Sequence, residues 1–155
     1  MARKPRPEKS TAEVLIGVSK SYQIAARRLT SEVETFAQVA PAFYLLGSYA
    51  MELAFKALYK KRGNATEDDL HNLGHDLKAA YNKAIGCGLH ERLWSADVPI
   101  MVGQLHDHHV QNNFRYAPAE GDPLKVPHPD MLMRTLDALL KEVDTVVFGA
   151  HEQDD

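Results

Sequence analysis

The chain has 155 residues, of which 45% are hydrophobic and 25% are charged, a composition typical of globular proteins. This length predicts a single domain, and the formal net charge of −3 excludes a polycation that coats nucleic acid. No apolar run of about 18 residues or more occurs, so we expect no spanning helix and no association with a membrane. The single cysteine, Cys87, and the lack of a signal-peptide pattern predict a cytoplasmic protein.

The two ends of the chain lack apolar periodicity and carry opposite charges. We expect residues 1–10 to be a flexible basic tail, because they are rich in Lys, Arg and Pro. We expect residues 149–155 to be a flexible acidic tail, which leaves residues 11–148 as a single helical bundle domain. The basic tail is either a solvated terminus or an arm that contacts an acidic partner.

The first half of the domain predicts two long helices. Apolar residues recur at three- and four-residue spacings over 14–36, which indicates one long amphipathic helix. Ser10 and Glu13 have the spacing of a capping box at its start, and Pro41 is expected to stop or kink it. Residues 42–61 are apolar on nearly all sides, so this second helix is expected to be the central element of the fold.

The second half predicts shorter helices separated by polar segments. After a polar connection over 64–74, which has room for one short turn, a helix is expected from about His75 to Ile85. Further helices are expected over about 97–115 and 130–147, with a proline-rich loop over 117–128 between them. No strand-like alternation appears. The predicted fold class is therefore all-α, an up-and-down bundle of four to five helices.

One feature with chemical potential lies in the most apolar predicted helix. Glu52 and Lys56 are four residues apart, which places a carboxylate and an ammonium on one face. Buried charges need a partner, so the pair is either a structural ion pair that fixes helix register or part of a polar pocket. Tyr49, and Tyr116 further along, are also open to two interpretations. They either fill the core or cap such a pocket.

A second feature is the segment His71–Leu77, which opens the third predicted helix. We expect His75 and Asp76 in its first turn, where a carboxylate suits the positive helix end. His75 can reach a carboxylate such as Glu52 and hold two helices in register. A metal site formed by His71 and His75 needs one continuous helix, and Gly74 between them argues against it.

The third feature is a histidine cluster on the helix predicted over 97–115. His106, His108 and His109 occur where its apolar face turns polar, and Asn112 and Arg115 continue that polar face. This face is either the ordinary polar end of a helix or a functional groove. Metal binding through His106 and His109 is a weaker third interpretation, because the spacing matches no metal signature. We expect no metal and no cofactor.

Taken together, these segments resemble the HEPN family of helical domains. The likeness lies in Tyr49-x-x-Glu52-Leu53-x-x-Lys56, followed by Gly74-His75-Asp76-Leu77, and extends over roughly residues 12–147. It implies a four- or five-helix up-and-down bundle that pairs as a homodimer. Many members of the family are RNA-cleaving toxins or defence effectors, and others have lost catalysis and act as binding or dimerisation modules.

Catalytic members of this family carry an arginine followed, after roughly four to six residues, by a histidine. The histidine acts as general acid/base on the 2′-hydroxyl and the arginine steadies the phosphate. Here the histidine that follows Arg115 is His128, beyond the proline-rich loop, so the motif is absent. The resemblance therefore favours a non-catalytic binding or dimerisation module, accessory to a stress, toxin–antitoxin or defence system, with RNA, a nucleotide or a protein as partner.

The alternative is a metal-independent HEPN-type ribonuclease with a displaced site. Its candidate catalytic residues are His108, His109 and Arg115, which converge only if the fold brings them together. The residues expected in binding or in a polar core are Tyr49, Glu52, Lys56, His75, Asp76, Asn112 and Tyr116.

Overall fold

The computed structural model describes residues 11–89, 97–110 and 126–149. Every regular element in these ranges is helical, with six α-helices and one 3₁₀ turn, so the all-α prediction is confirmed. No helix in them is both long and apolar enough to cross a membrane. Both predicted tails, apart from Gly149 at the edge of the second, lie outside the described residues, as does most of the proline-rich loop.

The first helix, α1 (Ala12–Leu29), is shorter than predicted. Its N-cap is Thr11, whose hydroxyl accepts a hydrogen bond from the Val14 amide, so the cap is not at Ser10. It ends at Leu29 because the hydroxyls of Thr30 and Ser31 bond back to carbonyls of the last turn, at 2.7 and 2.8 Å. A short 3₁₀ turn, η1 (Val33–Thr35), then leads to the next helix.

The second helix, α2 (Phe36–Arg62), is the central element, as its apolar composition predicted. It packs against α1, α4, α6 and α7 and buries Phe43, Met51 and Phe55 completely. Pro41 lies inside this helix, so its predicted role as the boundary is wrong. It is the sixth residue of α2, and it has no N–H to donate to the carbonyl of residue 37, yet the helix continues through it.

The segment predicted as a polar connection contains an additional helix. This is α3 (Glu67–Leu73), which begins with a capping box in which Thr66 and Asp69 satisfy each other's backbone amides. The following helix, α4 (Leu77–Gly86), starts two residues later than predicted, because Asp76 is its N-cap and accepts from the Ala79 amide at 2.9 Å. His75 therefore lies before α4, in the link from α3. The part of the chain that the structure describes contains six α-helices, where four or five were expected.

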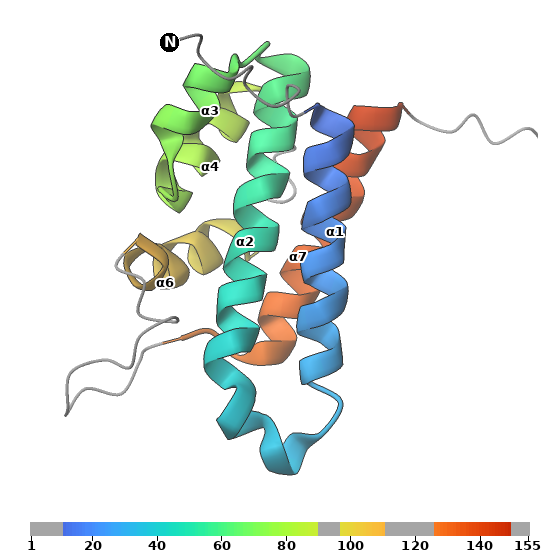
Figure 1. The fold of residues 1–155 in the computed structure, drawn as a ribbon, viewed down its shortest axis with the longest axis vertical. Helices are drawn as coiled ribbons and strands as arrows, with labels where there is room; N and C mark the ends of the chain where they lie inside the picture. Colours follow the sequence, from blue (N-terminus) through green and yellow to red (C-terminus); the bar gives the residue numbers. More distant parts are fainter. Residues whose placement is uncertain (1–10, 90–96, 111–125, 150–155) are drawn as a thin grey trace, which may run out of the picture.

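The remaining helices are α6 (Val98–Val110) and α7 (Pro129–Phe148). Figure 1 shows α1, α2 and α7 side by side, while α3, α4 and α6 lie on the other side of α2. One core joins all of these layers, since completely buried side chains come from α1, α2, α4, α6 and α7. The arrangement places the middle of α2 between α1 and the α4–α6 pair, and this is where the candidate site lies.

Candidate functional site

A buried carboxylate, that of Glu52, forms the centre of the site. Its side chain on α2 is 2% exposed, and its Oε1 accepts a hydrogen bond from Lys56 Nζ at 2.6 Å. The same ammonium donates to the carbonyl of Gly74, also at 2.6 Å. Lys56 therefore ties α2 to the link between α3 and α4. The ion pair predicted from the four-residue spacing is confirmed, and its second bond explains how it fixes the register of two segments.

His109 provides the second short contact to this carboxylate. Its Nε2 lies 2.6 Å from Glu52 Oε2, and its side chain on α6 is only 1% exposed. An ionised carboxylate can only accept, so the imidazole donates its Nε2 proton. Within the described residues the other ring nitrogen, Nδ1, is buried and has no hydrogen-bond partner. His109 thus holds α6 against α2 through a single charge-assisted bond.

His75 completes the group and connects it to the surface. Its Nδ1 lies 3.3 Å from both oxygens of Glu52, as the sequence predicted. Its side chain is 57% exposed, whereas those of Glu52 and His109 are almost fully buried. We call these four residues (Glu52, Lys56, His75 and His109) the Glu52 cluster. It draws on α2, on the link before α4 and on α6.

An aromatic side chain, that of Tyr49, packs beside both histidines. Its ring meets His75 edge-on at a centroid distance of 5.6 Å and His109 at 5.1 Å. On the other side it stacks against Tyr22 of α1, with centroids 5.6 Å apart. Tyr49 is therefore a packing element that separates the cluster from α1, and its ring restricts the orientation of both imidazoles.

Opposing influences set the pKa of Glu52. Burial by itself raises the pKa of this carboxyl, because it penalises the charged form. The hydrogen bond from His109, followed by the charge and hydrogen bond of Lys56, outweighs burial and holds the pKa below its ordinary value. The cluster therefore contains a permanent carboxylate at neutral pH.

The structure separates the other predicted site residues from this cluster. Asp76 caps α4, and His106 lies 3.6 Å from it while accepting a hydrogen bond from the Lys78 amide at 3.2 Å. His106 and His109 therefore face different partners, and the structure does not bring them together as a metal pair. His108 is partly buried on α6. The predicted residues Asn112, Arg115 and Tyr116 lie outside the described residues.

The contact between His109 and Glu52 is the functional feature that sequence reasoning missed. The two residues are 57 positions apart, so no spacing rule connects them. One signal pointed toward it: a histidine on an apolar helix face is buried and therefore needs a polar partner. Glu52, a carboxylate on the most apolar helix, had the complementary need.

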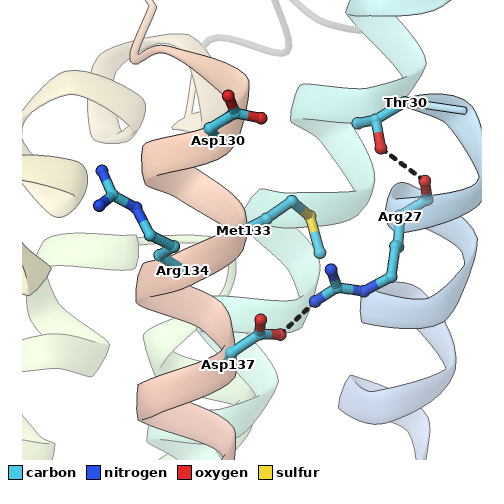
Figure 2. A pocket seen from close by; sticks show the side chains of 6 residues that line it. All are labelled: Arg27, Thr30, Asp130, Met133, Arg134 and Asp137. Carbon is cyan, nitrogen blue, oxygen red and sulfur yellow. Dashed lines mark hydrogen bonds and ion pairs between the residues drawn. The ribbon is translucent and has the colours of Figure 1, made fainter.

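A separate surface pocket of about 560 Å³ lies between α1 and α7. Figure 2 shows its lining, in which Arg27 of α1 donates to Asp137 of α7 at 2.5 Å while Arg134 points away from that pair. The negative charge of Asp130 balances the positive charge of Arg134, so the lining has no excess of either charge. We assign no ligand to this pocket, because its polar groups bind each other or face solvent.

The chain was also compared with family models, with curated proteins and with solved structures, and none of the three comparisons found a match. The features of the molecule that bear on function are therefore the geometry of the Glu52 cluster and the surface of the helices.

Proposed function

We propose that the protein is a non-catalytic HEPN-like binding or dimerisation module that acts as an accessory part of a stress, toxin–antitoxin or defence system. The observation that carries this proposal is the convergence of the two segments on which the resemblance rests. Lys56 of the first segment bonds to Gly74 of the second, and His75 of the second faces Glu52 of the first. Segments that are separate in the sequence thus act as one unit.

The chemistry of the cluster supports binding or pairing more than catalysis. A general base must come within hydrogen-bond reach of the proton that it removes. The Nε2 of His109 is occupied by Glu52 at 2.6 Å, and its Nδ1 is buried. The alternative, a metal-independent ribonuclease, therefore loses His109 as an accessible base and depends on His108 and Arg115.

The outer surface of α1 and α7 supports pairing of two copies. Ile24 is 52% exposed beside Leu140 of α7, and Phe148 is 55% exposed with the Lys20 ammonium 5.7 Å from its ring centre. A second copy of the chain that covers this surface removes apolar area from water, which is the main driving force of association.

Sedimentation equilibrium over a range of protein concentrations tests the pairing. We expect a dimer that Ile24→Arg converts to a monomer. Ile100→Arg is the matched control, because Ile100 is 50% exposed on α6, away from this surface. A chain that stays monomeric at the highest concentration, or a dimer that tolerates Ile24→Arg, contradicts pairing through α1 and α7.

Incubation with structured and single-stranded RNA in EDTA tests the absence of catalysis. We expect intact RNA at high protein concentration. Cleavage that persists in EDTA and disappears in both His108→Ala and Arg115→Ala overturns the proposal in favour of the ribonuclease. Cleavage that survives both substitutions indicates a contaminating nuclease, and a repeat with further purified protein then decides.

A further inference from the structure

We infer that Glu52, His75 and His109 form a binding site for one divalent transition-metal ion of the zinc class. One ligand atom from each residue lies within 4.8 Å of the other two. Two imidazoles and one carboxylate form a donor set that proteins use for zinc and similar ions, with further positions left for water or a ligand. This inference goes beyond the proposed function, because a module that never dimerises still has these three donors.

One of the distances between the donors already equals that expected around a bound ion. At zinc–ligand bonds of about 2.0–2.1 Å, tetrahedral donors lie about 3.3 Å apart. His75 Nδ1 already lies 3.3 Å from Glu52 Oε2. The shorter 2.6 Å between Glu52 and His109 is the length of a hydrogen bond, and it widens when an ion replaces the Nε2 proton.

Two donors are fixed and the third is adjustable. Glu52 projects from the interior of α2 and His109 from the last turn of α6, and both side chains are buried. His75 stands in the link between α3 and α4, outside either helix, with more than half of its side chain exposed. It can therefore close on an ion that enters from solvent, and its exposed side gives water access to the remaining coordination position.

Lys56 shapes the site without excluding an ion. Its ammonium lies 2.6 Å from Oε1 of Glu52, and His109 Nε2 lies 2.6 Å from Oε2. His75 Nδ1 lies 3.3 Å from both oxygens. Because Oε1 is bonded to Lys56, Oε2 is the oxygen through which Glu52 would ligate an ion as a monodentate ligand. The positive charge also repels a second cation nearby, so Lys56 limits the affinity of the site. Removing that charge is expected to tighten metal binding, an effect that no surface histidine site shares.

The test uses full-length protein without a histidine tag, titrated with Co²⁺ and then with Zn²⁺. We expect one Co²⁺ per chain with the visible absorption of a four-coordinate ion, and displacement by one Zn²⁺. His75→Ala should weaken binding at least about 10–100-fold, the range known for loss of a supporting group near a metal. His71→Ala is the matched control, because this exposed histidine lies four residues away on α3 and outside the cluster.

Lys56→Met tests an effect on metal affinity that a chance histidine site does not predict. We expect at least about tenfold tighter Zn²⁺ binding, since removal of a neighbouring positive charge favours a cation. Circular dichroism checks that this variant folds, and if it does not, His75→Ala and His71→Ala decide alone. Absence of stoichiometric Co²⁺ and Zn²⁺ binding, or equal affinities of wild type, His75→Ala and His71→Ala, overturns the inference.

Discussion

Replacing Glu52 with glutamine tests whether the cluster holds the fold together through its charge. The substitution keeps the size and shape of the side chain and removes only the negative charge. In the wild type, Glu52 accepts two short charge-assisted hydrogen bonds, from Lys56 and from His109, both at 2.6 Å. Glutamine leaves the Lys56 ammonium without its counter-charge and turns an amide NH₂ or a neutral oxygen toward His109.

The magnitude follows from these two bonds. Hydrogen bonds to charged groups contribute about 1.5–3 kcal/mol and those between neutral groups about 0.5–1.5 kcal/mol. The exchange at His109 costs about 1–1.5 kcal/mol. The Lys56 ammonium loses its counter-charge but keeps its bond to the Gly74 carbonyl, so this loss adds about 1–3 kcal/mol, less than the ~3–5 kcal/mol for a buried pair broken outright. We therefore expect Glu52→Gln to lower the free energy of unfolding by about 2–4 kcal/mol.

Urea denaturation in EDTA, followed by circular dichroism, measures this change. Asp137→Asn is the matched control, because Asp137 also accepts from two side chains, Arg27 at 2.5 Å and Gln23 at 2.7 Å, but on the surface. An exposed pair of this kind contributes no more than about 1 kcal/mol. If Glu52→Gln costs as little as Asp137→Asn, the carboxylate is not the organising charge that the structure indicates.

Three further predictions concern the helices. Gly17→Ala should raise the free energy of unfolding by about 0.5–1 kcal/mol, because Gly17 lies inside α1 with open space where a Cβ would stand. Gly47→Ala should lack that gain, because its Cβ would stand 2.8 Å from Cδ2 of the buried Leu132; equal melting temperatures for the two variants would refute this contrast. The hydrogen bond from the Thr66 amide should hold the pKa of Asp69 below its ordinary 3.8 in an NMR titration, and an ordinary value would argue against the capping box. The stability that Asp69 contributes is thus present above pH 3.8, is lost as the pH falls through the lowered pKa, and should be missing in Asp69→Asn.

The parts of the fold that follow from hydrophobic periodicity were predictable. The central position of α2 and the extent of α7 (Pro129–Phe148) follow from the apolar pattern within each helix. Such a pattern can be read from the local sequence alone. The end of α1 was not predictable in this way. The apolar pattern continues past Leu29, and hydroxyl groups at Thr30 and Ser31 that bond to carbonyls of the last turn end the helix instead.

The candidate site was predictable only as far as contacts between neighbouring segments. The pair of Glu52 and Lys56 follows from helix geometry, and the reach of His75 follows from two consecutive helices. His109 comes from a helix much further along the chain, and only packing of α6 against α2 and α4 places its imidazole beside Glu52. Sequence spacing carries no information about that packing.

The distance along the chain between Glu52 and His109 also has a consequence for the order in which the protein forms. A chain that ends before α6 contains the carboxylate of α2 but only Lys56 and His75 to neutralise it. Burial of Glu52 is therefore incomplete until residue 109 has been added and α6 has docked, which makes this a late, non-local step of folding. During synthesis, the central helix keeps one polar face open to water until more than two thirds of the chain exists.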